Sequence, residues 1–204
     1  MGSSAVILAG GKSSRMGKDK VFLPLAGKPL FEYVFEVCRG IFQEVIVVTH
    51  RPEHFSSYPL RAVKDLVTGG ALGGLYTGLL CASNPYIFCV ACDLPFLRPS
   101  LIRYLLSLKE GYDAVVPIAP DGLHPLTAVY SKECVDAIEE ALAQRHLKIS
   151  QVFERINVRF CNPAEIRPLD PEFLSFFNVN TEADLLRAEG ILRGISSRGD
   201  LVLS

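Results

Sequence analysis

Runs of apolar, β-branched residues alternate along the chain with segments whose apolar residues recur every three or four positions. The first pattern predicts buried strands, and the second predicts helices with one apolar face. Strands are expected at 4–8, 44–49, 61–64, 86–92, 113–117, 125–130 and 159–161. Helices are expected to begin at Pro29, to span 75–82, 99–108 and 132–143, and to follow a cap at Thr181.

This alternation of strands and helices determines the expected fold class. Continuous apolar strands separated by helices predict a mainly parallel sheet that is covered on both faces. We therefore expect an α/β fold, a three-layer Rossmann-like sheet with helices on both faces. The glycines of 68–74 predict a turn before the next helix, and Asn178–Val179 is expected near a strand end. The 204 residues are few enough for one core, so we expect a single domain over 1–194 and a flexible tail over 195–204.

Charged and glycine-rich loops follow the expected strands. In parallel sheets, ligands bind beyond the carboxyl ends of the strands. The loop after 4–8 contains Gly10, Gly11, Arg15 and Lys20. Glycines let backbone N–H groups approach a ligand, Arg15 can bind two phosphate oxygens, and Lys20 can act as a point charge. The loop therefore predicts a polyphosphate site, although a plain glycine-rich turn is the alternative. It fits neither the P-loop nor the dinucleotide fingerprint.

Acidic residues follow two other strands. Asp93 comes directly after the strand at 86–92 and before Pro95, where a carboxylate can hold Mg²⁺ against phosphate oxygens. The alternative for Asp93 is a cap of the turn. Asp65 follows 61–64 and could contact the base, the ribose or the metal, or lie in a solvated turn. These positions predict an acidic side to the same site.

Asn178 and Asn180 are two residues apart, so an extended backbone would place both side chains on the same side. They could reach the metal or an acceptor substrate. Capping of the helix that follows Thr181 is the alternative.

Composition and charge narrow the range of possible functions. The 21 basic and 22 acidic residues give a net charge of −1, so we expect no general attraction to nucleic acid or to an anionic membrane. No apolar run approaches the ~20 residues that span a bilayer, and no signal peptide is recognisable. Cys89 and Cys92 have C-x-x-C spacing, but on a strand they would face opposite sides. Free buried thiols, and with them a cytoplasmic location, are the expectation.

The segment from Leu8 to Lys20 reads LAGGKSSRMGKDK, which resembles the signature of molybdenum cofactor guanylyltransferases. These enzymes belong to the nucleotide-diphospho-sugar transferase superfamily. Further segments resemble blocks of the same family: Asp65 with 70–74, 92–96, 124–126 and 177–181. The resemblance covers residues 6 to about 185 of the chain. Ala71 stands where the family often has proline, and Val48 where some members carry asparagine.

The resemblance implies transfer of GMP from GTP to the terminal phosphate of molybdopterin, with release of pyrophosphate. It implies that Arg15, Lys20 and Asp93 are catalytic, that Asp93 holds Mg²⁺, and that His124 lies on the acceptor side. The residues implied in nucleotide or cofactor binding are Leu8, Ala9, Gly10, Gly11, Lys20, Asp65, Gly74, Asp93, Asn178 and Asn180. For Leu8, Ala9 and Gly10 the backbone amides would make the contact. The expected partners are GTP and molybdopterin, with transient contact to cofactor-synthesis or acceptor proteins allowed.

Two other functions remain open. An enzyme of the same class could use CTP with the same pterin, or could act on a sugar or polyol phosphate. A non-catalytic subunit that only binds a nucleotide is the second alternative. The presence of both Asp93 and Lys20 argues against it, because a pure binder needs no metal at the α-phosphate.

Overall fold

The structure is a computed structural model that describes residues 2–10 and 20–197. Gly11 and Arg15 lie outside these ranges, so their expected contacts with a nucleotide stay predictions. Lys20 begins the short 3₁₀ helix η2, Lys20–Phe22.

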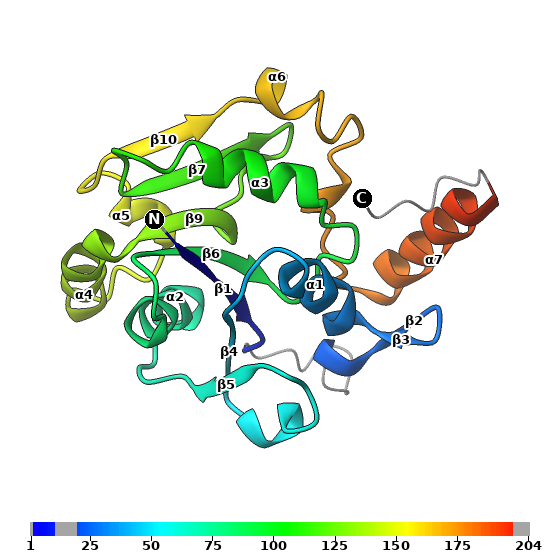
Figure 1. Cartoon of the computed structure of the whole chain (residues 1–204), viewed down its shortest axis with the longest axis horizontal. Helices are drawn as coiled ribbons and strands as arrows, with labels where there is room; N and C mark the ends of the chain where they lie inside the picture. The colour runs from blue at the N-terminus through cyan, green and yellow to red at the C-terminus, as the bar shows by residue number, and fades with distance from the viewer. Residues whose placement is uncertain (1, 11–19, 198–204) are drawn as a thin grey trace.

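The central sheet has the strand order β10-β7-β9-β6-β1-β4-β5 (Figure 1). Its strands are β1 Ser3–Leu8, β4 Val45–Thr49, β5 Arg61–Lys64, β6 Tyr86–Ala91, β7 Ala114–Ala119, β9 Thr127–Ser131 and β10 Val158–Cys161. β1 lies between β4 and β6 and runs parallel to both, and β5 continues this parallel set. β9 runs antiparallel to both of its neighbours, β6 and β7, and β10 is parallel to β7. The short strand β8, Gly122–Leu123, forms a hairpin with β7. The expected mainly parallel sheet is confirmed.

Helices cover both faces of the sheet. Buried residues of α1, α3 and α6 share a cluster with Ile7 and Val47, whereas those of α2, α4 and α5 share a cluster with Val6 and Ile46. Neighbouring strand residues point to opposite faces, so the two clusters lie on the two sides of the sheet. The helices are α1 Leu30–Arg39, α2 Gly70–Cys81, α3 Pro99–Ser107, α4 Val135–Ala143, α5 Ile149–Val152 and α6 Pro163–Ile166. The expected three layers are confirmed.

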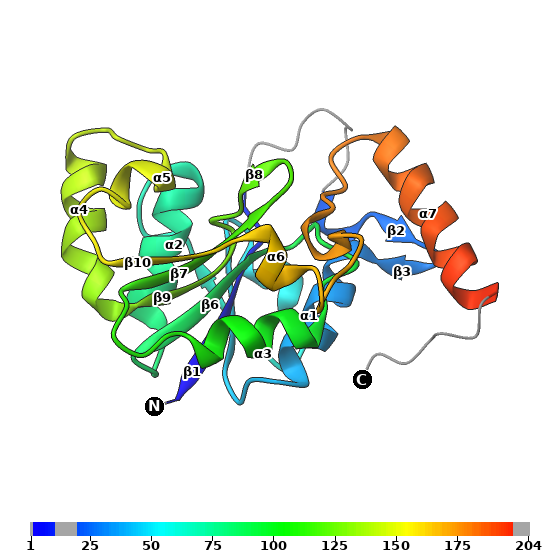
Figure 2. The same ribbon diagram turned by 90° about the horizontal axis from the view of Figure 1, so that it is seen from above.

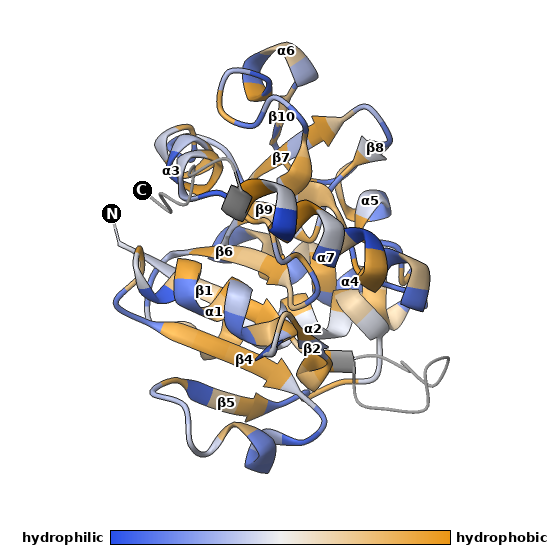
Figure 3. Ribbon diagram, turned by 90° about the vertical axis from the view of Figure 1, so that its right-hand side faces the viewer, coloured by the Kyte–Doolittle hydropathy of each residue, from blue (hydrophilic) through white to orange (hydrophobic). Residues whose placement is uncertain are grey.

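Hydropathy follows the position of each strand in the sheet. Figure 3 shows β1, β4 and β6 as mainly hydrophobic, and β4 is buried along its whole length. Arg61 and Lys64 are exposed at the ends of β5, which is an edge strand. Short, charged edge strands discourage pairing with another chain. No helix among residues 2–10 and 20–197 has the length and hydrophobicity needed to cross a bilayer.

A small third cluster lies beside the sheet. The hairpin of β2, Pro24–Leu25, and β3, Lys28–Pro29, lies next to α7, Glu182–Ser197 (Figures 1 and 2). The buried residues of this cluster are Leu25, Leu30, Phe96, Val179 and Ala188. Because Phe96 follows β6 and Val179 precedes α7, the cluster joins the end of a central strand to the last helix.

Three local expectations differ from the structure. α2 begins at Gly70, so the glycines of 70–74 are helical and do not form a turn. A Cβ on Gly73 would lie 2.9 Å from the carbonyl oxygen of Val67, so close packing requires glycine there. Asn178 and Val179 lie in a connection and not at a strand end. α7 continues to Ser197, so residues 195–197 of the expected tail are helical.

Candidate active site

The candidate site lies at the carboxyl edge of β1, β4, β5 and β6. Leu8 at the end of β1 is in register with Val48 of β4 and with Ala91 at the end of β6. Since these strands are parallel, the segments that contain Gly10, Asp65 and Asp93 leave the sheet at the same edge. The expected convergence of a glycine-containing loop and two acids is therefore present among the described residues.

β1 ends at Leu8, and Gly10 is the second residue beyond the strand. The amide of Ala9 donates to the carbonyl oxygen of Val48 at 2.9 Å, and the carbonyl oxygen of Leu8 accepts from the amide of Cys92 at 3.2 Å. We expected the amide of Ala9 to bind the nucleotide, but in the structure it donates its hydrogen bond to the sheet. Gly10 is exposed, and a Cβ there would lie 3.8 Å from Nε2 of His50. His50, which the sequence did not single out, therefore borders the same loop.

Asp93 lies in the turn after β6. Its side chain is half-buried, and its Oδ1 atom is shielded from solvent. The described residues contain no group of three or more His, Cys, Asp or Glu side chains able to hold a metal ion. Mg²⁺ is commonly held by one or two carboxylates together with substrate phosphates and water. A single shielded carboxylate at a strand end fits an ion of that kind.

Asn178 and Asn180 are brought to Asp93 by a backbone hydrogen bond. The amide of Val179 donates to the carbonyl oxygen of Asp93 at 3.0 Å. Val179 is buried whereas Asn178 and Asn180 are exposed, as an extended backbone requires. The cap of α7 is a reciprocal pair, in which Oγ1 of Thr181 accepts from the amide of Asp184 and Oδ2 of Asp184 accepts from the amide of Thr181. Asn180 adds its own amide to Oδ2 of Asp184.

Asp65 is held by α2. Its Oδ1 atom accepts a hydrogen bond from Oγ1 of Thr77 at 2.9 Å, and Thr77 is fully buried. Oγ1 of Thr77 in turn accepts from the amide of Leu66 at 3.1 Å. Thr77 was missed from the sequence, although a threonine on the apolar face of a helix is a usable signal. Gly74 serves packing in this structure, because a Cβ there would lie 3.2 Å from a methyl group of Leu8.

His124 lies between β8 and β9. Its Nε2 atom is 2.8 Å from a carboxylate oxygen of Asp121, and its ring centroid is 4.4 Å from that of Phe176. Phe176 belongs to the segment that leads to Asn178. His124 is thus in contact with the segment that precedes Asn178, and its place on the acceptor side stays a prediction.

The cysteines of the described residues form no disulfide. Cys89 and Cys92 belong to the clusters on opposite faces of the sheet, as their strand spacing predicted. Burial raises the pKa of the Cys89 thiol, which keeps it protonated near neutral pH. The pair is therefore part of the core, and a zinc or redox role is not supported.

Comparison with known proteins decides the family. A model of the MobA-like NTP transferase domain matches residues 5–158. The chain belongs to the MobA-like NTP transferase family. It is 39% identical over 187 residues to the probable molybdenum cofactor guanylyltransferase of Pelotomaculum thermopropionicum, with 91% of each chain covered. It is 33% identical over 193 residues to the molybdenum cofactor guanylyltransferase of Desulfosudis oleivorans, with 93% of this chain and 96% of that protein covered.

Solved structures agree with this MobA-like assignment. The molybdopterin-guanine dinucleotide biosynthesis protein A of Archaeoglobus fulgidus matches with a TM-score of 0.83 and 33% identity, over 94% of this chain and 99% of that one. The 4-diphosphocytidyl-2C-methyl-D-erythritol synthase of Anaerococcus prevotii matches with a TM-score of 0.71 and 17% identity, over 94% and 98%, which shows the shared fold alone. The expected family and fold are confirmed, and this MobA-like chain is a nucleotidyltransferase.

Proposed function

We propose that the protein transfers GMP from GTP to molybdopterin and releases pyrophosphate. The names of the relatives that match over nine-tenths of their length support this reaction. The observation that carries it is the bond between the Val179 amide and the Asp93 carbonyl oxygen, which places Asn178 and Asn180 beside the acidic end of β6. One edge of the sheet then offers a nucleotide side and an acceptor side.

The reaction forms one bond and breaks one. An oxygen of the terminal phosphate of molybdopterin attacks the α-phosphorus of GTP, and the bond from that phosphorus to the bridging oxygen breaks as pyrophosphate leaves. In such transfers the protein contributes mainly orientation and charge stabilisation. We assign the amide of Gly10 to the nucleotide, Arg15 and Lys20 to the triphosphate charge, and Asn178 with Asn180 to the acceptor.

Asp93 is the residue proposed to hold Mg²⁺. When bound, the ion neutralises charge on the phosphate oxygens. Asp65, held by Thr77 at a defined position, would orient the ribose or the base at the other end of the nucleotide. We place the reaction in the cytoplasm, where free thiols such as those of Cys38 and Cys89 persist.

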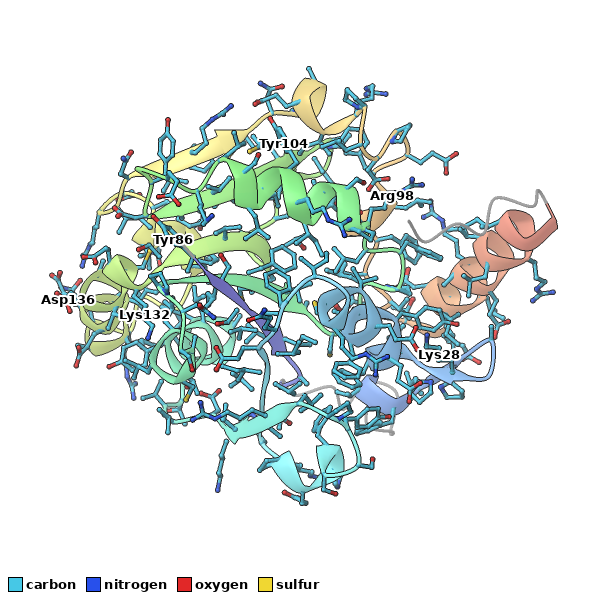
Figure 4. The ribbon with its side chains drawn as sticks, in the orientation of Figure 1. Lys28, Tyr86, Arg98, Tyr104, Lys132 and Asp136 are labelled. Carbon is cyan, nitrogen blue, oxygen red and sulfur yellow. The ribbon has the colours of Figure 1, made fainter. Side chains whose placement is uncertain are left out.

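Pyrophosphate release tests the proposal directly. The purified protein is assayed with Mg²⁺, molybdopterin and either GTP or CTP. Lys20→Ala is expected to lower the GTP-dependent rate by roughly a hundredfold, as loss of a charge stabiliser does, and Asp93→Ala is expected to lower it as well. Lys109→Ala is the matched control, because the Lys109 ammonium lies over the ring of Tyr86. Tyr86 begins β6 at the end of the strand away from Asp93 (Figure 4).

The outcomes separate the remaining alternatives. A preference for CTP would support the proposed site and show that the protein transfers CMP instead of GMP. Wild-type turnover in Lys20→Ala would contradict the role of that lysine. No pyrophosphate with either nucleotide would favour a subunit that only binds.

A further inference from the structure

The segment that brings Asn178 and Asn180 to the site is anchored by a buried acid, Asp170. The Asp170 side chain is fully buried. Its Oδ2 atom accepts from the amide of Ser175 at 2.8 Å, and its Oδ1 atom accepts from the amide of Leu174 at 3.1 Å. Nε of Arg98 lies 3.2 Å from the same Oδ1. One carboxylate therefore joins the turn of 170–175 to Arg98.

Arg98 belongs to the segment that follows Asp93, and a second hydrogen bond runs in the other direction. The backbone amide of Arg98 donates to Oγ of Ser175 at 3.1 Å, and Ser175 is fully buried. Arg98 is the N-cap of α3 and lies beside the chain that leads to α7 (Figure 4). Two reciprocal contacts thus connect the loop after β6 to the turn before Asn178.

A third contact holds the same turn from the side of the β7–β8 hairpin. Phe176 is buried, and its ring packs on that of His124. The amide of His124 donates to the carbonyl oxygen of Pro117 at 3.0 Å, which ties the histidine to the end region of β7. The turn of 170–176 is therefore held on two sides before the chain reaches Val179.

Burying a carboxylate lowers the stability of the fold unless the group is paired and hydrogen-bonded. Even then, an apolar residue of similar size in its place often gives a fold of equal or greater stability. Apolar packing does not specify one register, whereas Asp170 satisfies two named amides and one guanidinium. Hydrogen bonds of this kind specify a single arrangement of the segment. We therefore expect the Asp170 carboxylate to fix the position of residues 174–180.

We propose that Asp170 is a positioning residue that sets Asn178 and Asn180 relative to Asp93 and so governs use of the acceptor but not of GTP. This role rests on the proposed function, since it assigns Asn178 and Asn180 to the acceptor. Asp170 acts through Arg98, Ser175 and the Val179–Asp93 bond, and it touches neither substrate.

Hydrogen exchange tests the anchor without any assay of activity. In Asp170→Asn, the amide of Val179 should exchange at least about tenfold faster. The substitution removes the charge of the carboxylate that accepts from the amides of Leu174 and Ser175, and so weakens the hold on the segment that leads to Val179. The amide of Cys92, which donates to Leu8 within the sheet, should keep its wild-type rate. Asp113→Asn is the matched control: Oδ2 of Asp113 accepts from the amide of Asn157 at 2.8 Å, just before β7 and at the opposite edge. Unchanged protection of Val179 in Asp170→Asn would overturn the proposal.

Steady-state kinetics test the consequence. The KM for molybdopterin should rise about tenfold or more in Asp170→Asn, while the KM for GTP stays within about twofold of wild type. Equal changes in both KM values would overturn the positioning role and leave a structural one. If Asp170→Asn fails to fold, Ser175→Ala removes only the bond from the Arg98 amide and should show the same split with a smaller amplitude. No turnover by the wild-type enzyme would overturn the proposed function, and the exchange comparison would still decide whether the anchor exists.

Discussion

The tightest contact between α2 and β1 lies at Gly78, which has no side chain. A Cβ on Gly78 would lie 2.5 Å from Cγ1 of Val6, a separation that real Cβ atoms do not adopt. Val6 is fully buried in the central strand and has little room to move. Close approach of α2 to the sheet therefore requires glycine at position 78.

Alanine at position 78 is expected to destabilise the protein. Overpacking costs about 1–3 kcal/mol, which exceeds the gain of up to about 1 kcal/mol in helix propensity. Gly190→Ala is the matched control, because a Cβ there meets nothing within 4 Å in α7. It should raise the free energy of unfolding by about 0.5–1 kcal/mol. Urea denaturation measures both variants, and changes of the same sign would contradict the packing argument.

Glu165 makes stability depend on pH. The backbone amide of Asn162 donates to its carboxylate at 2.9 Å and lowers its pKa, partial burial opposes this, and hydrogen bonds from Tyr104 and Arg159 lower it further. The unfolded chain therefore takes up this proton at a higher pH than the folded chain does. The stabilisation is present above the unfolded pKa of about 4.3 and is lost as the pH falls through the lower folded value.

Glu165→Gln is expected to unfold at lower urea than wild type at pH 7. The gap should shrink as the pH falls below about 4.3, because the carboxylate of the unfolded wild-type chain then takes up a proton before that of the folded chain does. Glu172→Gln, at an exposed position, should show little gap at either pH. Urea denaturation at pH 7 and pH 3 gives the comparison, and a gap of constant size would exclude the carboxylate as its cause.

Among the elements, α7 depends on its first turn. Thr181 and Asp184 cap one another reciprocally, and Oδ2 of Asp184 also accepts from the amide of Asn180 at 3.0 Å. Asp184→Ala is expected to lower the free energy of unfolding by about 0.5–2 kcal/mol, since capping groups contribute about this much. Glu189→Ala removes only an exposed pair with Arg193 on the same helix and should cost less than about 0.5 kcal/mol. Equal effects in thermal or urea unfolding would contradict the importance of the cap.

The elements also show where sequence reasoning succeeded and where it did not. β4 and β6 were predicted to within about a residue because buried parallel strands are continuous apolar runs. The start of α2 was missed because Gly70, Gly73 and Gly74 are poor helix formers. Close contacts with Val67 and Leu8 explain glycine at positions 73 and 74, and a left-handed backbone with a φ of 59° explains it at position 70. Local propensity was overridden by packing, which one sequence does not reveal.

At the scale of the whole molecule, binding of GTP with Mg²⁺ should stabilise the fold. At a ligand concentration one hundred times the Kd, the gain is about 2.7 kcal/mol, which for a domain of this size corresponds to a Tm increase of roughly 5–10 °C. EDTA and, independently, Asp93→Ala should each reduce the increase. Differential scanning calorimetry measures it, and an increase that survives both changes would remove Asp93 from the metal site.

The topology of the whole molecule was only partly predictable. Hydrophobic patterns located β9 but carry no information about its direction, which is antiparallel between β6 and β7. The edge that gathers Asp65 and Asp93 was predictable, because ligand loops follow the carboxyl ends of parallel strands. The role of Asp170 was not predictable, since it depends on Arg98, a partner far away in the sequence.

The bond between Val179 and Asp93 joins two segments that leave the ribosome at different times. At about 5–20 residues per second, Asp93 is synthesised roughly 4 to 17 seconds before Val179. Every residue assigned to the nucleotide has been synthesised once Asp93 is made, whereas Asn178 and Asn180 are added near the end of translation. A message truncated before Asp170 would therefore encode every residue assigned to the nucleotide but neither Asn178 nor Asn180, so we expect the truncated chain to be unable to complete the proposed transfer.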